Sequence, residues 1–355
     1  MTDGLLIYGA NGYTGEMIAR AAAARGLAPV LAGRSAGPIQ ALGRELGCES
    51  RVFSLDDPAA VAAALAGSRV ALHCAGPFSA TAAPMMAACL AARAHYTDIT
   101  GEIEVFELGF RHDAAARQAG IVVCPGVGFD VVPTDCIALT LKQAMPDATH
   151  LALGFDSRSG ISRGTAATSV EGLGNGSRVR EDGEIRRIPL GARTRRIDFG
   201  AGEKLAAAIP WGDVSTAYRT TGIPNIEVYV PVSPRALANL RRIGRLGWLL
   251  RLRAAQAFMK WRIRKGAPGP SAVEREKTPI FVWGEVRNAV GRTVSARVRV
   301  PNGYTVTTDA SVEIARRLLA GSVPPGFTTP AQLMGADFVT RLPGALPGAM
   351  QITVE

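Results

Sequence analysis

The 355-residue chain has few of the residues that bind metals or form disulfide frameworks. It has five cysteines and four histidines, and the cysteines form no CxxC pair and no cluster with histidine. Zinc sites and disulfide frameworks are therefore not expected, so we predict no metal site and a reducing compartment. The cysteines are Cys48, Cys74, Cys89, Cys124 and Cys136.

Long apolar runs are also missing. The longest stretch without Asp, Glu, Lys or Arg, residues 70–92, is broken by Gly76, Pro77 and Pro84. Because a membrane-spanning helix needs about 20 mainly apolar residues, this stretch is typical of a strand, a loop and a helix. No basic segment followed by an apolar core opens the chain, so no secretory signal is expected. We predict a cytoplasmic protein, with peripheral attachment to the inner membrane as an open variant.

The positive charge is concentrated in one segment. The formal net charge is +10, and residues 239–265 hold nine cations and no carboxylate. Because the charge lies on one segment without the interleaved aromatic residues of a base-stacking surface, we predict no nucleic-acid partner. The cations are Arg241, Arg242, Arg245, Arg251, Arg253, Lys260, Arg262, Arg264 and Lys265.

The same segment has the apolar spacing of an amphipathic helix over residues 240–263. Several partners stay open for it: an anionic membrane with Trp248 and Trp261 at the interface, an acidic carrier bearing the substrate, the protein's own core, or a second subunit in a homodimer. Its apolar face is Ile243, Leu246, Leu250, Ala254, Ala257, Phe258 and Trp261.

Short apolar runs alternate with alanine-rich helical stretches over the first 125 residues. This alternation predicts right-handed crossovers and a doubly wound parallel sheet, that is, an α/β Rossmann domain over residues 1–148. The predicted strands are 5–8, 29–32, 51–55, 70–74, 96–99 and 121–124, and the predicted helices are 15–25, 39–46, 58–65, 82–91 and 103–118.

Longer strand patterns joined by turns follow after residue 150. They predict an α+β substrate or dimerisation domain over residues 149–330 with a mostly antiparallel sheet, and a segment 331–355 that returns to the Rossmann domain. Residues 301–303 are predicted as a turn between strands, 311–319 as a helix and 265–272 as a linker. The strand candidates are 151–155, 226–232, 280–288 and 293–300.

Three glycines at intervals of three follow the first predicted strand. Gly9 allows a sharp turn, Gly12 lets a pyrophosphate approach, and Gly15 lets the next helix pack closely on the strand. A plain strand-to-helix turn is the alternative. The context of a first βα unit favours nucleotide binding, for which the candidates are Gly9, Ala10, Asn11, Gly12, Tyr13, Thr14 and Gly15.

The second predicted strand ends in Gly33, Arg34 and Ser35. An NAD site places an acidic residue here, whereas a cation and a hydroxyl suit the 2′-phosphate of NADP. We therefore predict NADP(H), with a solvent-facing arginine in a turn as the alternative. Ser54 ends the third strand and is a further cofactor candidate.

A loop of small residues follows the fourth strand, at the edge of the sheet where ligands bind in such folds. We predict that its backbone approaches the nicotinamide ribose, although residues 76–77 also fit a simple turn. The cofactor candidates are Ala75, Gly76, Pro77 and Phe78.

Three further segments, HYTDITGE (95–102), PGVGFDVVPTD (125–135) and PNGYTVT (301–307), join the glycine motif and the CAGPF loop. Together they resemble the saccharopine dehydrogenase-like oxidoreductases, especially the trans-acting enoyl reductase branch. The resemblance implies an NADP-binding Rossmann domain joined to a substrate domain. The sequence departs from the family pattern at Ser54, where an acidic residue near the adenine is usual.

Candidate groups for proton transfer follow the fifth and sixth strands. Asp130 or Tyr304 is predicted to relay a proton, Asp98 is a further catalytic candidate, and Phe129 is predicted to lie against the nicotinamide. Capping of nearby helices by Asp98, Glu102 and Asp135 is the alternative.

Our leading hypothesis is an NADPH-dependent oxidoreductase that reduces an enoyl or similar double bond of a hydrophobic, lipid-like substrate. No lysine lies in a motif at a strand end, so saccharopine-type C–N chemistry on an amino-acid-derived substrate is the second hypothesis. A third is a sensor or scaffold that binds NADP without turnover.

Overall fold

The computed structural model describes residues 4–160, 162, 176–245, 269–346 and 350–354. Contacts divide the chain into two compact units. The first comprises Met1–Val132, Gly303–Gly335 and Leu342–Gly344, and the second comprises Pro133–Asn302, Ala336–Arg341 and Ala345–Glu355. This division differs from the predicted boundaries at 148 and 330, because residues 133–148 belong to the second unit and residues 303–330 to the first. Of the segment 331–355, only residues 331–335 and 342–344 belong to the first unit, so its predicted return to the Rossmann domain is correct for these residues alone.

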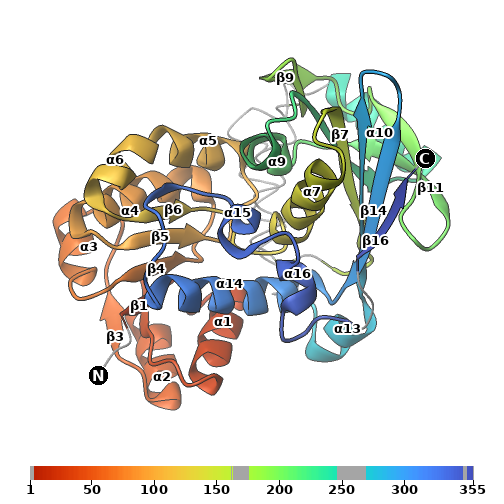
Figure 1. The fold of residues 1–355 in the computed structure, drawn as a ribbon. Coiled ribbons are helices and arrows are strands. Elements are labelled where there is room, and N and C mark those ends of the chain that lie inside the picture. Colours follow the sequence, from red (N-terminus) through yellow and green to blue (C-terminus); the bar gives the residue numbers. More distant parts are fainter. Residues whose placement is uncertain (1–3, 161, 163–175, 246–268, 347–349, 355) are drawn as a thin grey trace. The chain divides into compact units, whose positions relative to one another are not determined.

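The first unit contains a parallel sheet of seven strands in the order β15-β6-β5-β4-β1-β2-β3 (Figure 1). The chain switches direction across the sheet between β1 and β4, which confirms the predicted doubly wound topology. Strands β1, β2 and β4 are fully buried, as expected when helices cover both faces. The strands are β1 (Leu5–Tyr8), β2 (Val30–Gly33), β3 (Ser50–Val52), β4 (Val70–His73), β5 (His95–Asp98), β6 (Val122–Cys124) and β15 (Gly326–Phe327).

Helices cover both faces of this sheet (Figure 1). One layer holds α1 (Tyr13–Ala24), α2 (Ala36–Leu46) and α14 (Gly303–Leu319), and the other holds α3 (Pro58–Ala64), α4 (Phe78–Ala92), α5 (Ile103–Arg111) and α6 (Asp113–Ala119). The single helix predicted over 103–118 is two helices that meet at His112. Helix α15 (Pro330–Met334) completes the unit.

Helix α14 corrects the prediction for residues 301–319. It begins at Gly303 rather than at 311, so residues 301–303 lead from a strand into a helix and do not join two strands. The run of threonine and valine in its first two turns favours strands by propensity. Packing on α1 overrides that preference, and the ion pair between Arg25 and Asp309 links the two helices.

The second unit has a mixed sheet in the order β10-β11-β12-β7-β13-β14-β16, with the β8–β9 hairpin beside β12. Apart from the β7–β12 pair, its neighbouring strands run antiparallel, which confirms the predicted mostly antiparallel sheet. Strands β8 to β11 and β16 were not predicted. The strands are β7 (Ala148–Asp156), β8 (Ser177–Glu181), β9 (Glu184–Ile188), β10 (Thr194–Asp198), β11 (Glu203–Ala208), β12 (Asn225–Pro231), β13 (Ile280–Asn288), β14 (Thr293–Val300) and β16 (Gln351–Val354).

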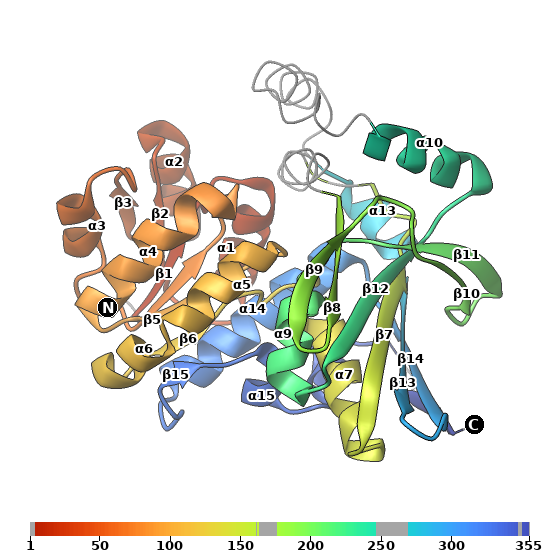
Figure 2. The same ribbon diagram turned by 90° about the horizontal axis from the view of Figure 1, so that it is seen from above.

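Helices α7 (Val132–Ala144) and α9 (Asp213–Thr221) lie on the same face of this second sheet (Figure 2). The close packing requires a glycine on β13, because a Cβ on Gly284 would lie 2.4 Å from a methyl group of Ile137. Short helices α13 (Ala272–Lys277) and α16 (Phe338–Arg341) also belong to this unit.

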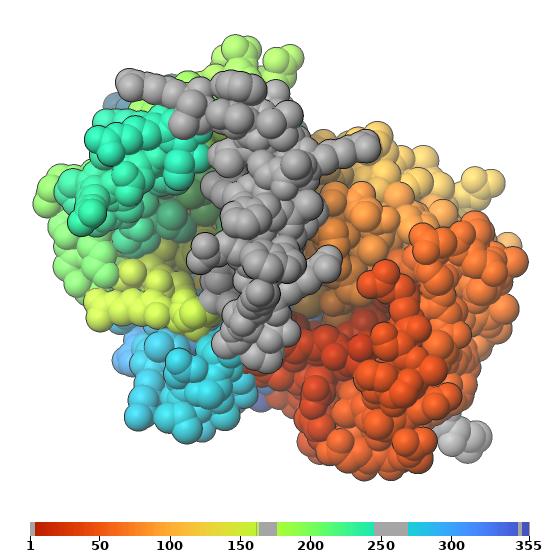
Figure 3. All heavy atoms as spheres, turned by 180° about the vertical axis from the view of Figure 1, so that it is seen from behind, coloured from red at the N-terminus to blue at the C-terminus, as the bar shows by residue number. Residues whose placement is uncertain are grey.

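Of the predicted basic helix, the structure describes only the beginning, within α10 (Pro234–Arg245). Helix α10 lies on the surface of the second unit (Figure 3, teal), with Arg241 and Arg242 exposed. The Arg241 Nε donates a hydrogen bond to the carbonyl oxygen of Gly191 at 3.0 Å. The rest of the segment, with Trp248 and Trp261, lies outside the described residues. Among the described residues, we find no helix with the length and hydropathy needed to span a bilayer.

Candidate cofactor site

The turn after β1 is built on a glycine with a left-handed backbone. Gly9 has a φ of +81°, and its amide donates to the carbonyl oxygen of Ala32 at 2.7 Å. A Cβ at this position would lie 2.9 Å from both the amide nitrogen and the Cβ of Ala75. Only glycine fits here, since both the φ angle and the neighbouring loop exclude a side chain.

Helix α1 starts directly after this turn. Gly12 is its N-cap and offers no side chain to the amides of the first turn. Gly15 packs on Gly9 so closely that a Cβ would lie 2.2 Å from the Gly9 carbonyl oxygen. The exposed residues Asn11 and Gly12 therefore form an open turn at a helix N-terminus, which is the arrangement that binds phosphate.

The end of β2 lies beside the glycine-rich turn, because β1 and β2 are neighbouring strands. A Cβ on Gly33 would lie 2.9 Å from the side-chain oxygen of Asn11, so the two loops touch. Arg34 and Ser35 follow and are exposed. Ser35 is the N-cap residue of α2, but its side chain makes no cap hydrogen bond. The cation and the hydroxyl thus lie exposed at the end of β2, and their contact with a 2′-phosphate stays a prediction.

Ser54 lies farther along the same edge, after β3. Its hydroxyl donates to a carboxylate oxygen of Asp56 at 2.8 Å and accepts from the Asp56 amide at 3.3 Å. Asp57 caps α3 through the amides of Ala59 and Ala60. The Ser54 side chain is therefore engaged in a local turn, and its contact with the cofactor stays a prediction.

The loop that follows β4 lies on the other side of the glycine-rich turn. The Gly76–Pro77 peptide bond is cis, and Phe78 begins α4. The Thr81 hydroxyl lies 2.8 Å from the carbonyl oxygen of Ala75 and 3.0 Å from that of Pro77. The conformation of the loop is thus held by the first turn of its own helix.

Asp98 ends β5 and is fully buried. Its carboxylate accepts hydrogen bonds from the Tyr96 hydroxyl at 2.6 Å and from the amides of Thr100 and Gly126 at 3.0 and 2.8 Å. Burial raises the pKa of Asp98 to about 6, against the lowering effect of these bonds. The side chain therefore ties the loops after β5 and β6 together, and its catalytic role stays a prediction.

Phe129 and Asp130 follow β6 and are half-buried. The Phe129 amide donates to the Thr307 hydroxyl at 3.0 Å, which fastens this loop to the first turns of α14. Desolvation by burial raises the pKa of Asp130 to about 7. A carboxyl group with this pKa is partly protonated near neutral pH, which suits a proton donor.

Tyr304 also belongs to this edge, although the sequence placed it in the second domain. It lies in the first turn of α14, and its ring contacts the Tyr13 ring edge-on with a centroid distance of 5.1 Å. Because Tyr13 is part of the glycine motif, α14 brings a candidate proton donor to the glycine-rich turn from almost 300 residues farther along the chain.

Comparison with known proteins supports a dinucleotide site at this edge. Residues 5–124 match the family model of the saccharopine dehydrogenase NADP binding domain. They form a saccharopine dehydrogenase-type NADP-binding domain. The resemblance seen in the sequence motifs and the prediction of NADP(H) as cofactor are both confirmed.

Similar proteins extend the likeness beyond this domain. The chain is 29% identical over 219 residues to the trans-acting enoyl reductase of Mycobacterium tuberculosis, a match that covers 57% of this chain and 51% of the relative. It is 24% identical over 314 residues to a saccharopine dehydrogenase-like oxidoreductase of Bos taurus, covering 79% and 71%. The chain thus spans about half the length of the mycobacterial relatives that it matches.

A solved structure shares the fold over the whole chain. The apo saccharopine dehydrogenase (L-Glu forming) of Saccharomyces cerevisiae has a TM-score of 0.66 and covers 99% of each chain at 11% sequence identity. At this identity the match shows the fold, and the chemistry of the site rests on this chain's own residues.

The residues of the NADP-binding domain fit the cofactor. Gly12 is exposed, and a Cβ there would meet a single atom, the Gly9 carbonyl oxygen at 3.2 Å, so space for a pyrophosphate remains above the turn. Gly9, Gly12 and the start of α1 would hold the pyrophosphate, and Arg34 with Ser35 would hold the 2′-phosphate. No metal is implied, and among the described residues no group of His, Cys, Asp and Glu is arranged to bind one.

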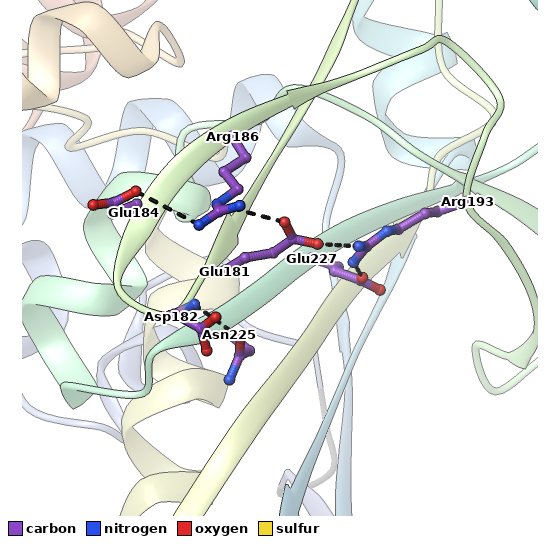
Figure 4. A network of polar contacts seen from close by, with 7 residues as sticks. All are labelled: Glu181, Asp182, Glu184, Arg186, Arg193, Asn225 and Glu227. Carbon is purple, nitrogen blue, oxygen red and sulfur yellow. Dashed lines mark hydrogen bonds and ion pairs between the residues drawn. The ribbon is translucent and has the colours of Figure 1, made fainter.

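A cavity of about 610 Å³ lies in the second unit, and no residue of the cofactor motifs lines it. Its walls carry paired charges. Arg193 bridges the carboxylates of Glu181 and Glu227 (Figure 4), and Arg195 also pairs with Glu285. This network joins the β8–β9 hairpin to β12, where the strand pairing is short. Because the arginines already have carboxylate partners, we interpret the network as structural.

Sequence reasoning missed two side chains that shape the cofactor edge, Thr81 and Thr307, and the backbone contacts of a third, Glu102. Thr81 and Glu102 bind the backbone around the β4 loop, and Thr307 binds the β6 loop. Capping of α5 by Glu102 was the alternative considered for this residue, but its side chain makes no cap bond there. The Glu102 and Thr307 contacts join separate elements, so the local sequence held no signal for them beyond a polar residue next to a motif.

Proposed function

We propose that the protein uses NADPH to reduce an enoyl or similar activated double bond of a hydrophobic, lipid-like substrate. Support comes from the oxidoreductase family of its NADP-binding domain and from the name of its mycobacterial relatives, trans-acting enoyl reductase. Bound NADPH supplies the hydride. The protein's own residues must then orient the substrate and deliver one proton.

The main support for this proposal is the distribution of charge among the loops that follow the strands of the parallel sheet. In this fold the residues after β2 meet the adenosine half of the cofactor, so the loops after β4, β5 and β6 lie towards the nicotinamide. These loops, 74–78, 98–102 and 125–130, and the first turns of α14 contain no Lys or Arg. Burial lowers the pKa of His73 to about 3, so this side chain is neutral.

A substrate carboxylate therefore finds no cation among these segments of the NADP-binding domain. An amino-acid-derived substrate would need a cation from outside these segments, such as Arg158 or Arg163, whereas an uncharged acyl chain would not. The charge pattern supports the enoyl substrate over saccharopine-type C–N chemistry, for which the bovine relative and the yeast fold are the remaining support.

Asp130 is the first candidate for the proton donor. Its pKa of about 7 keeps a large fraction protonated at neutral pH, and it lies at the end of the β6 loop next to Gly101. Tyr304, beside Tyr13, is the second candidate. Protonation of the carbon next to the activating carbonyl group would follow hydride addition at the other alkene carbon.

NADPH consumption in the presence of substrate panels tests the proposal. Enoyl thioesters of increasing chain length should be reduced, with the specificity constant rising with chain length as more apolar surface is buried. Faster turnover of an amino acid plus an oxo acid would favour the C–N alternative. Tight NADPH binding with no turnover of either panel would favour a non-catalytic NADP-binding protein.

We also propose that the basic segment 240–265 contacts an anionic membrane or an acidic carrier. Its cation excess supports this, because each Lys or Arg near an anionic surface adds about 1 kcal/mol. In a flotation assay with anionic liposomes, replacing Arg242 and Arg245 by Gln should reduce binding, and Arg241 stays in place because it binds Gly191. Unchanged binding would favour internal packing or a dimer contact.

A further inference from the structure

Glu102 connects two neighbouring βα units of the NADP-binding domain. It is the N-cap residue of α5, yet its side chain bonds to the start of α4 instead. One carboxylate oxygen accepts from the Phe78 amide at 2.9 Å and the other accepts from the Ser79 amide at 2.7 Å. A carboxylate at this position satisfies two amides that the helix leaves unpaired and complements the helix dipole.

Hydrogen bonds from the residues after β5 hold the backbone that carries the Glu102 carboxylate. The Glu102 amide donates to the Thr100 hydroxyl at 3.0 Å, and the Thr100 amide donates to the buried carboxylate of Asp98 at 3.0 Å. The same Asp98 oxygen binds the Gly126 amide after β6. A continuous set of hydrogen bonds therefore runs from the ends of β5 and β6 to the start of α4.

The loop that Glu102 holds forms one wall of the cofactor site. Residues 74–78 run from β4 to α4, and Ala75 touches the position that a Gly9 side chain would occupy. The Thr81 hydroxyl holds the Ala75 and Pro77 carbonyl oxygens, and His73 Nε2 lies 2.9 Å from the same hydroxyl. The loop is thus fixed at its α4 end by Glu102 and at two of its carbonyl groups by Thr81.

We propose that Glu102 is a positioning residue that holds the 74–78 loop in the conformation that receives the nicotinamide half of NADP(H). The proposal rests on cofactor binding by this domain and not on the identity of the reduced substrate. Without the carboxylate, the start of α4 loses both acceptors and the loop loses its anchor. The adenosine half of the site, built from Arg34 and Ser35 after β2, stays intact.

Two ligands distinguish effects on the nicotinamide half of the site from effects on the adenosine half. NADPH spans the whole site, whereas adenosine 2′,5′-bisphosphate fills only the adenosine half. For Glu102→Ala we expect an NADPH Kd about tenfold or more above that of the unaltered chain, with the Kd of the bisphosphate unchanged within about twofold. Glu102→Gln keeps one acceptor oxygen and should fall between the two.

Controls follow from the same contacts. Glu104→Gln removes an exposed carboxylate two residues away and should leave both Kd values unchanged. Thr81→Val removes the hydroxyl that bonds the loop carbonyl groups. It should raise the Kd for NADPH but not the Kd for the bisphosphate, as Glu102→Ala does. It also decides the outcome if Glu102→Ala does not fold.

Two results would overturn the proposal. One is NADPH binding by Glu102→Ala and Thr81→Val that equals that of the unaltered chain. The other is an equal loss of affinity for NADPH and for the bisphosphate, because a general disruption of the fold would affect the adenosine half of the site as well. Binding alone is measured, so a failure to reduce enoyl substrates would leave these results interpretable.

Discussion

Replacing Gly15 by alanine would place a methyl carbon 2.2 Å from the Gly9 carbonyl oxygen and 2.9 Å from the Gly9 carbonyl carbon. Favourable contact between non-bonded heavy atoms begins at about 3.5 Å, so α1 would have to move away from β1 by roughly 1 Å. Both atoms belong to the backbone of a turn that Ala75 holds from the other side, so neither can yield cheaply.

The expected cost follows from this overlap. Overpacking in a tight core costs about 1–3 kcal/mol, and the higher helix propensity of alanine returns less than about 1 kcal/mol. We expect a net loss of about 2 kcal/mol, which corresponds to a fall in Tm of about 4–8 °C for a domain of this size. NADPH binding should also weaken, because the displaced helix carries the pyrophosphate amides.

Gly12→Ala is the matched variant. Gly12 has ordinary extended angles, φ −82° and ψ 159°, and its nearest neighbour would be 3.2 Å from an added Cβ. We expect a stability loss below about 1 kcal/mol. The new methyl group would nevertheless occupy the space that the pyrophosphate approaches, so the NADPH Kd should rise more than about tenfold.

Differential scanning fluorimetry and NADPH fluorescence titration measure the two effects. The reasoning predicts that Gly15→Ala loses stability and that Gly12→Ala loses affinity with little change in Tm. Unchanged NADPH affinity in Gly12→Ala would refute the assignment of this turn to the pyrophosphate, and an unchanged Tm in Gly15→Ala would refute the packing argument.

Three further variants test other parts of the site. Arg34→Ala should lower the affinity for NADPH by about 10- to 100-fold, because a charge-assisted hydrogen bond contributes about 1.5–3 kcal/mol. The affinity for NADH should stay unchanged. Equal effects on both cofactors would contradict a 2′-phosphate contact. If Asp130 donates the proton, kcat should fall as pH rises through about 7, where the carboxyl group loses its proton, and Asp130→Asn should lower kcat and remove this limb. A limb retained near pH 7 would show that Asp130 is not the proton donor. Thr307→Val removes the hydroxyl that accepts from the Phe129 amide and should lower the free energy of unfolding by about 1–3 kcal/mol. The control Thr308→Val removes a hydroxyl that bonds the Tyr304 carbonyl oxygen within α14 and should lower it less. Equal losses of stability in the two variants would contradict a stabilising role of the Phe129 contact.

Several parts of the cofactor site followed from local sequence. The glycine motif was predictable because a turn between a strand and a helix depends on the backbone angles of a few consecutive residues, and Gly9 and Gly15 occupy the positions that require glycine. The parallel sheet was predictable because alternating strands and helices permit few connections. Arg34 was predictable because it directly follows a strand whose partner carries the motif.

Contacts between distant residues could not be predicted in the same way. Strands β8 to β11 were missed because they carry charges on both faces, and their pairing partners rather than their own pattern define them. Tyr304 was placed in the second domain because α14 follows that domain in the chain. Packing on α1, not sequence order, decides where α14 belongs.

The sequence by itself determined the doubly wound fold, the NADP turn and the preference for a 2′-phosphate, since each depends on short segments with strong backbone or charge requirements. Tertiary structure alone decided which polar side chains hold the site together. Glu102 caps α4 rather than its own helix because the carboxyl ends of parallel strands meet at one edge, where residues far apart in sequence become hydrogen-bond partners.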